Sequence, residues 1–498
     1  MSRSDRMGPT GYRRLIAQAL RAHSLLGLVL GALIYQVCLT GTVSMLAPEW
    51  KRWEQPGAPR VEAADPQAFA AALAAGIEQA RDPDATVMVF GPTDELARMR
   101  VRVPGTLHGW TNADGVPVAP ATTPWTTFLV SLHDSLHLPF PWGRLLIAVS
   151  GVALLAAVGT GVMAHGRIFR DAFRLRLGGS KRLEAADLHN RMSVWALPFH
   201  AGIALTGAAL ALMAFAWPLL AQLSPGEGGA RAELFAPPAA AVRHGAEPYP
   251  DIAAMVRAVE RKAAPARVNF LLVQRAGRRD RSIEIGTDAP YDLANGEAWY
   301  PVGDGRQFIK AGFTDGSTGK QLQAALYPLH VGKFGGLAMR LLYVLLGFAL
   351  CWITATGMTI WFERRQAKGL HSPRLERLWI AVLWGQPAAL AGSALAAAIW
   401  PNSAAATYVA GTLVTVLAAV PPCKVSNLSA ALRALTAFMI AAACAAHLDM
   451  PGEASGDPLA LWMSLTLLVA VPILLAPWLR NALRRSRGQS MIGGRMRS

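Results

Sequence analysis

The sequence predicts an all-α polytopic membrane protein with about eight transmembrane helices, in which a duplicated four-helix core carries two small α+β domains outside the cytoplasm. Composition is the first observation behind this prediction. Of 498 residues, 53% are hydrophobic and 16% charged, with a mean hydropathy of +0.29, whereas a soluble protein has about 25% charged residues. The second observation is a set of apolar blocks of about the 20 residues that a spanning helix needs, and the third is an internal repeat. A water-soluble enzyme and a disordered protein are therefore disfavoured.

The apolar blocks occur in eight places. They cover residues 23–46, 142–164, 189–220, 336–362, 377–400, 404–421, 427–448 and 458–480, and the sixth is the weakest because it is short and ends at Pro421 and Pro422. Arginine and lysine concentrate in every second connection and near both ends of the chain, so the positive-inside rule places both termini in the cytoplasm. These basic flanks account for the formal net charge of +16, and nucleic acid is therefore not expected as a partner. The first block exceeds the apolar core of a signal peptide and is expected to remain as a span.

Two long polar insertions, residues 47–130 and 221–328, separate the first four blocks and are expected outside the cytoplasm. Each has one amphipathic helix pattern, 67–80 in the first and 251–263 in the second. Strand-like runs follow at residues 86–90, 99–103, 268–274 and 282–286, with Gly, Asp and Pro between them. Each insertion can therefore form a small α+β domain. The other predicted parts are a first transmembrane helix (12–46), helices two and three with a basic cytoplasmic loop (131–220), helix four (329–366), four additional helices (375–480) and a basic cytoplasmic tail (481–498).

The first four spans repeat in pairs. Thr40-Gly41 follows His23 by 17 positions, and Thr206-Gly207 follows His189 by the same 17 positions. Spans two and four share a frame in which Thr160-Gly161 and Thr356-Gly357 begin 16 positions after Arg144 and Arg340. A duplicated unit of span, outer domain and span predicts a pseudo-symmetric core. The Thr-Gly pairs are expected to let helices pack closely and to do no chemistry.

Four histidines occupy matching places in this repeat: His23 and His189 toward the cytoplasm, and His133 and His330 toward the outside. Ionisable residues at membrane depth suggest function, and neutral imidazole is the commonest protein metal ligand. Two imidazoles can hold one b-type haem from both sides, which leaves its iron able only to exchange electrons. Pairing by depth predicts His23 with His189 and His133 with His330. The competing interpretation is that these histidines cap helices or contact lipid headgroups.

Neighbouring residues leave alternatives open. His137 could replace His133 if that segment is helical, and His200, on the helix face of His189, could bind a more deeply placed haem. Arg144 and Arg340 could pair with haem propionates, or they could anchor helix ends at the membrane surface. The four cysteines form no CxxC pattern, so a redox dithiol, a zinc site and covalent haem attachment have no support.

The stretches AHSLLGLVLGALIYQVCLTG, SLHDSLHLPFPWGRLL, DLHNRMSVWALPFHAGIALTG and YPLHVGKFGGLAMRLLYVLLG resemble the PepSY-associated transmembrane (PepSY-TM) family, iron-regulated inner-membrane proteins that include ferric-siderophore reductases. The resemblance implies two PepSY-like periplasmic domains and two haem b groups held by His23, His133, His189 and His330. It also implies one-electron reduction of Fe(III)-siderophore to Fe(II). This sequence departs from the pattern in two places. His133 is one residue further from its arginine than His330, and His200 stands where an apolar residue is expected.

The electron donor and the competing functions complete the prediction. The sequence has no GxGxxG after a strand, so electrons are expected from quinol or from a separate cytoplasmic donor, with the basic loop 166–182 suited to an acidic partner. One alternative is an inner-membrane transporter of a siderophore or another small molecule, although carboxylates are missing from the apolar blocks. Another is a haem-free assembly or protease-regulating membrane protein.

Overall fold

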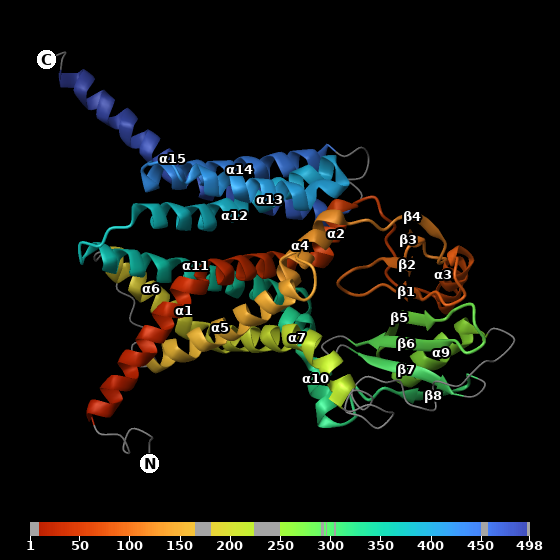
Figure 1. Ribbon diagram of the computed structural model, residues 1–498. Coiled ribbons are helices and arrows are strands. Elements are labelled where there is room, and N and C mark those ends of the chain that lie inside the picture. The colour runs from red at the N-terminus through yellow and green to blue at the C-terminus, as the bar shows by residue number, and fades with distance from the viewer. Residues whose placement is uncertain are drawn as a thin grey trace. The chain divides into compact units, whose positions relative to one another are not determined.

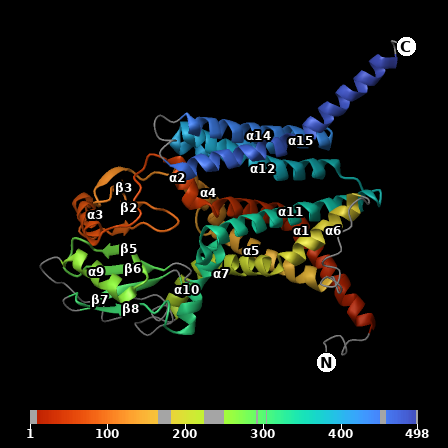
Figure 2. The same ribbon diagram turned by 180° about the vertical axis from the view of Figure 1, so that it is seen from behind.

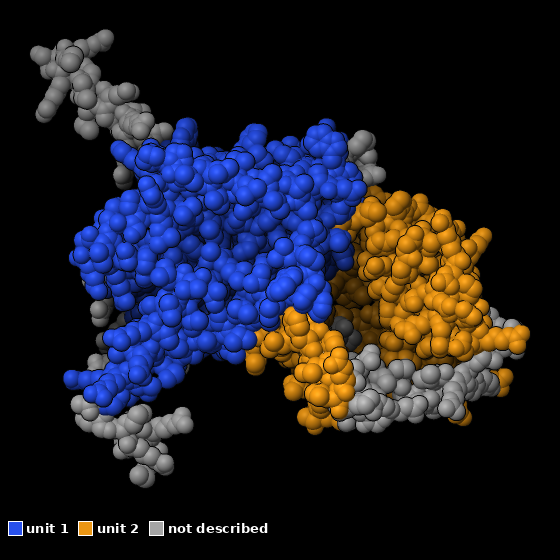
Figure 3. Space-filling model, in the orientation of Figure 1, with its two compact units in different colours: residues 1–56, 124–201, 346–498 blue, residues 57–123, 202–345 orange. Residues whose placement is uncertain are grey.

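The computed structural model describes residues 9–164, 181–223, 250–289, 293–294, 296–302, 305–449 and 457–495. The chain divides into two compact units (Figure 3). Unit 1 comprises residues 1–56, 124–201 and 346–498, and unit 2 comprises residues 57–123 and 202–345.

Seven helices within the described residues have the length and apolarity that a bilayer crossing requires. They are α1 (Pro9–Ser44), α5 (Trp142–Ala164), α7 (Leu197–Leu223), α11 (Gly336–Gln366), α12 (Pro373–Ile399), α14 (Val425–Leu448) and α15 (Pro458–Arg495). Large apolar side chains on them are exposed, for example Val29, Leu345 and Ile473 at 66%, 66% and 65%. Lipid tails rather than water suit such surfaces. The prediction of a mostly helical, multi-pass membrane protein is confirmed.

The sixth predicted span is the exception. Its helix, α13 (Ala404–Ala418), has 15 residues, fewer than the roughly 17 that the shortest spanning helices use. By helix length alone, the described residues therefore contain seven candidate spans and not the predicted eight. A short 3-10 turn, η4 (Pro401–Ser403), joins α13 to the end of α12. At the other end, buried Arg377 of α12 donates from Nε to the Ala419 carbonyl at 2.9 Å, so α13 ends beside the beginning of α12.

The third predicted span, residues 189–220, is two helices. α6 (Lys181–Trp195) ends before Ala196, and α7 begins at Leu197. Pro198 is the second residue of α7. Proline has no N–H to continue the hydrogen-bond ladder from α6, and it fits best in the first turn of a new helix. The expectation that His189 and His200 share one helix face is therefore wrong, because they lie on different helices.

Two further histidines also lie outside the long spans. His133 is on α4 (Pro124–Ser135), which precedes α5, and His330 is on α10 (Thr318–Val331), which precedes α11. Gly332 ends α10 with a φ of 64°, a left-handed conformation that glycine adopts without strain. A 3-10 turn, η3 (Lys333–Gly335), leads from there to α11. The repeat is thus of helix pairs, α4 with α5 and α10 with α11.

Unit 2 contains one eight-stranded antiparallel sheet (Figure 1). Its strands are β1 (Val87–Phe90), β2 (Met99–Val103), β3 (Leu107–Thr111), β4 (Pro117–Pro120), β5 (Arg267–Gln274), β6 (Ser282–Asp288), β7 (Glu297–Val302) and β8 (Gln307–Lys310), in the order β4-β3-β2-β1-β5-β6-β7-β8. The four predicted strand runs are β1, β2, β5 and β6. The two predicted helices are α3 (Pro66–Gln79) and α9 (Ile252–Ala263), which begin at the capping carboxylates of Asp65 and Asp251.

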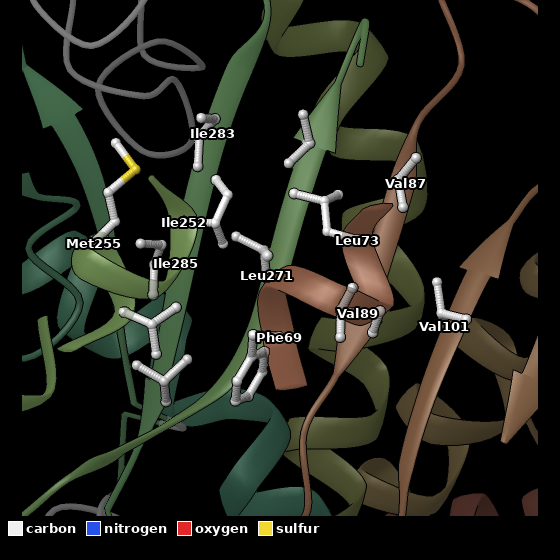
Figure 4. Close-up of a cluster of buried hydrophobic side chains, with 14 of the residues drawn as sticks. Phe69, Leu73, Val87, Val89, Val101, Ile252, Met255, Leu271, Ile283 and Ile285 are labelled. Carbon is white, nitrogen blue, oxygen red and sulfur yellow. The ribbon is translucent and has the colours of Figure 1, made fainter. Parts of the chain in front are cut away.

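The two polar insertions meet where β1 pairs with β5, with Val89 opposite Leu271. Side chains from α3, α9 and both sets of strands form one buried cluster that includes Phe69, Ile252 and Ile285 (Figure 4). At the same joint, exposed Arg278 binds Asp84 at 2.7 Å and holds the pKa of that carboxyl below its ordinary value. The insertions therefore share a sheet and a hydrophobic core.

In unit 1 the additional helices α12, α14 and α15 pack side by side (Figure 2). α2 (Ala47–Glu54) contributes Trp50 and Trp53 to a buried cluster with Trp125 of α4 and residues of α12 to α14. The Glu54 carboxylate accepts the Trp125 and Thr126 backbone N–H groups, both at 2.8 Å, at the start of α4. These contacts fix α4, and with it His133, against the ends of the additional helices.

Candidate functional site

The imidazoles of His23, on α1, and His189, on α6, face one another. Their ring centroids are 6.1 Å apart and their planes are inclined by 81°. Both residues lie in unit 1. The structure thus brings together the pair that the sequence predicted toward the cytoplasmic side, from two helices far apart along the chain.

The Nδ1 atom of each ring lies within hydrogen-bond distance of a backbone carbonyl on another helix, α5 for His23 and α11 for His189. His23 Nδ1 lies 2.9 Å from the Ala157 carbonyl of α5, and His189 Nδ1 lies 2.9 Å from the Ile353 carbonyl of α11. A carbonyl oxygen only accepts, so Nδ1 must carry the proton and the lone pair of the neutral ring is on Nε2. This is the arrangement by which ligand histidines are oriented toward a metal.

The other two predicted histidines are held in the same way. His133 Nδ1 lies 3.1 Å from the Val37 carbonyl of α1. His330 Nδ1 lies 3.0 Å from Thr206 Oγ1 of α7, and since that hydroxyl donates to the Gly202 carbonyl at 2.7 Å, it accepts from the ring. All four imidazoles therefore have the same tautomer.

Each of these rings also packs on the glycine of a Thr-Gly pair. His23 lies against Gly161, His133 against Gly41, His189 against Gly357 and His330 against Gly207. The sequence-based expectation that these pairs only bring helices together missed this contact. The 17-residue and 16-residue spacings of the repeat contained the signal, but they do not say which helix supplies the ring for which glycine.

The separation of the His23 and His189 rings would leave room for a metal ion that takes one nitrogen ligand from each ring. With metal–nitrogen bonds of about 2 Å, two imidazoles on opposite sides of one ion have ring centres about 6 Å apart, close to the separation of 6.1 Å found here. Within the described residues, no group of three or more His, Cys, Asp or Glu side chains could enclose a metal ion. Haem iron, whose equatorial ligands come from the porphyrin, needs only two from the protein.

His200 is a fifth buried imidazole. It lies on α7, is 2% exposed and makes a hydrogen bond with the backbone of Leu346 on α11. Its Nε2 atom is buried without a hydrogen-bond partner. His200 therefore stays a candidate ligand, as the sequence suggested, although not through a shared helix face with His189.

His137 differs from the other candidates. It follows α4 in a turn with a φ of 53°, is exposed, and bonds through Nδ1 to Ser131 Oγ at 3.0 Å. The suggestion that it replaces His133 assumed a continuous helix, and the helix ends at Ser135. His133 is the ring that reaches α1.

The two predicted propionate-binding arginines have carboxylate neighbours in the protein. Arg144 binds Asp134 at 3.0 Å, with both side chains 36% exposed. Arg340 is 4% exposed, and its Nε lies 3.6 Å from Glu95 in unit 2. Their role toward a propionate stays a prediction. Most of the basic loop 166–182 lies outside the described residues.

Comparison with known proteins covers the region that holds these histidines. The family model described as PepSY-associated TM region matches residues 20–364, a range that includes all four Thr-Gly pairs and ends before α12. The uncharacterized protein PA4219 of Pseudomonas aeruginosa is 30% identical over 306 residues, which is 56% of this chain and 76% of that relative.

Proposed function

The chain belongs to the PepSY-associated transmembrane family, and from this membership and the paired imidazoles we propose that it is an inner-membrane di-haem b-type reductase. In this proposal it passes single electrons across the membrane and reduces Fe(III)-siderophore to Fe(II) in the periplasm. Both termini lie in the cytoplasm and the sheet of unit 2 lies in the periplasm.

One observation supports the proposal most strongly. The rings of His23 and His189 lie next to each other, and the Nδ1 atom of each is hydrogen-bonded to a backbone carbonyl. A haem bound between two imidazoles supplies one-electron exchange and has no open position for oxygen. The protein's part is to hold both rings in one tautomer and at one separation. It also surrounds them with apolar helices, which influence the reduction potential.

A second haem, with His133 and His330 as its ligands, is proposed from the sequence repeat alone. His133 contacts α1 at Val37 and Gly41, which are 14 and 18 residues beyond His23. At 1.5 Å per residue these contacts lie about 21 to 27 Å further along the helix. The two sites would thus lie at two depths, as an electron path across a membrane requires.

The substrate and donor are proposed from chemistry and family resemblance. One electron from quinol, or from a cytoplasmic donor at the basic loop 166–182, would convert one Fe(III) to Fe(II). The lower charge of Fe(II) weakens its attraction to an anionic chelator, so iron is released from the siderophore. The chelator leaves unchanged.

The test is the haem content of the purified full-length chain. We expect a reduced-minus-oxidised spectrum of the b type and two haems per chain by pyridine haemochrome assay. His133→Ala should remove about half of the haem, because one of two metal sites loses a ligand, whereas His137→Ala, four residues away and exposed, should remove none. Folded protein without haem would contradict the proposal and favour a transporter or an assembly protein. Iron reduction is then measured in spheroplasts with a chromogenic Fe(II) chelator.

A further inference from the structure

The four Thr-Gly pairs have one geometry in common. We define a Thr-Gly seat as the pair together with the backbone carbonyl four residues before its glycine. These carbonyls belong to Val37, Ala157, Ile203 and Ile353. In three seats the carbonyl accepts the histidine Nδ1–H directly, and in the fourth the threonine hydroxyl lies between the ring and the carbonyl.

The threonine of each seat binds the same carbonyl. Each hydroxyl donates over the shorter distance, 2.7 to 2.9 Å, to the carbonyl four residues before it. The seat carbonyl is its second, longer acceptor, at 3.2, 3.1 and 3.0 Å from Thr40, Thr160 and Thr356 and at 3.4 Å from Thr206. A carbonyl oxygen has two lone pairs and can accept both groups. The threonine hydroxyl and the histidine Nδ1–H thus approach the same carbonyl, and the hydroxyl lies beside the position that the ring occupies.

The glycine of each seat makes room for the edge of the ring. A Cβ atom at Gly41 or Gly207 would lie 2.6 or 2.9 Å from the Cε1 atom of His133 or His330. At Gly357 and Gly161 the corresponding distances to His189 and His23 are 3.2 and 3.3 Å. Any larger residue would therefore displace the imidazole, and most strongly at the two outer seats.

We propose that the Thr-Gly seats are positioning sites that set the tautomer and the direction of the four ligand histidines, so that Nε2 points to the iron. This inference rests on the proposed function for the identity of the iron group. It adds eight positioning residues, two for each ring, none of which touches the metal. On this proposal, the Thr-Gly pairs recur in both halves of the repeat because each half has to position two histidine rings.

The chain offers matched controls for the glycines. At Gly27 on α1, Gly159 on α5 and Gly202 on α7, an added Cβ would meet no neighbouring atom within 4 Å, so alanine there tests the effect of a methyl group on the helix alone. We expect Gly41→Ala and Gly207→Ala to lower haem affinity at their site by about 10- to 100-fold, the usual cost of losing support for a ligand. Gly357→Ala and Gly161→Ala should retain haem but shift the midpoint potential and the EPR g-values, which report the angle between the two rings.

The threonine variants separate positioning from helix packing. Thr206→Val should disturb its haem more than Thr356→Val, because Thr206 Oγ1 is the partner of the His330 ring at 3.0 Å, whereas His189 bonds to the Ile353 carbonyl at 2.9 Å and lies 3.3 Å from Thr356 Oγ1. Thr206→Ser should restore the wild-type spectrum. If the four glycine variants match Gly27→Ala, Gly159→Ala and Gly202→Ala in haem content, potential and g-values, the inference is wrong even though the haem proposal stands.

A readout without haem keeps the two proposals distinguishable. In haem-free protein carrying ¹⁵N-labelled histidine, nitrogen chemical shifts report the tautomer. We expect His189 as Nδ1–H in the wild type and a mixture in Gly357→Ala. If the wild type proves haem-free yet shows this tautomer, the proposed function fails and the seat survives; if His189 is Nε2–H, the seat fails.

Discussion

His23 and His189 have ring centroids 6.1 Å apart and ring planes inclined by 81°, and each is bonded through Nδ1 to a carbonyl of a different helix. The accepting carbonyls belong to α5 and α11, and the rings themselves are on α1 and α6. Four helices therefore determine the distance between the two rings. A pair of imidazoles placed in this way behaves as a single unit toward any ion that both of them bind.

This unit predicts non-additive substitutions. His23→Ala and His189→Ala should each remove about half of the haem, and the double variant should remove no more, because residues that share one site do not add. The measurement is pyridine haemochrome per chain for the three variants. Two independent losses, leaving the double variant without haem, would show that the rings bind separate groups.

The connection between α13 and α14 predicts the number of membrane crossings. Arg377 binds the Ala419 carbonyl near the start of α12, and the preceding connection is rich in arginine, so Cys423 should face the cytoplasm. All four cysteines are free, and Cys423 alone among them is exposed. A membrane-impermeant maleimide should therefore label Cys423 in inverted vesicles and not in intact spheroplasts.

Two variants control this labelling experiment. Cys423→Ser should abolish the signal in inverted vesicles. Ala113→Cys, at an exposed turn of unit 2, should give labelling in spheroplasts on the Cys423→Ser background. Labelling of Cys423 from outside would mean that α13 does not cross the membrane and that seven crossings are correct.

Local patterns predicted much of the fold. The amphipathic repeats over 67–80 and 251–263 identified α3 and α9 within one residue at each end, because these helices bury one face whatever lies beyond it. The same holds for β1, β2, β5 and β6, which alternate buried and less buried side chains. β3, β4, β7 and β8 are short or lack clear alternation, and they were not predicted.

Long-range relationships were the part that the sequence could not supply. Nothing in β1 or β5 alone identifies the other as its partner, since antiparallel pairing depends on which edges meet in space. The same is true of the rings and the glycines: the repeat located His133 and Gly41, but only packing shows that they touch. The break before Pro198 had a local signal, and it was outweighed by the long apolar run around it.

The shared core predicts that the two insertions lose stability together. Leu271, at the centre of β5, is fully buried among side chains of both insertions. Leu271→Ala should cost about 2 to 5 kcal/mol, and limited trypsin digestion should then cut more readily in both insertions. Val118→Ala, on an exposed position of β4, is the control and should change little. Faster cleavage in the second insertion alone would show that the insertions unfold independently.

The ion pair of Arg52 and Asp457 predicts how strongly α15 is held. Arg52 of α2 meets both carboxylate oxygens at 2.8 and 2.6 Å, and the two side chains are only 16% and 8% exposed. Removing one partner of a buried pair costs about 3 to 5 kcal/mol because the other charge stays buried.

Asp457 also accepts the Leu459 N–H at 3.1 Å, at the start of α15. Asparagine caps a helix as well as aspartate does, so Asp457→Asn isolates the charge.

We therefore expect Asp457→Asn to lower the thermal midpoint of detergent-solubilised protein almost as far as Asp457→Ala does. The double variant Arg52→Met with Asp457→Leu should recover most of the loss, since an apolar pair of similar volume often replaces a buried ion pair without cost. If Asp457→Asn is as stable as the wild type while Asp457→Ala is not, capping rather than charge holds α15 at this end.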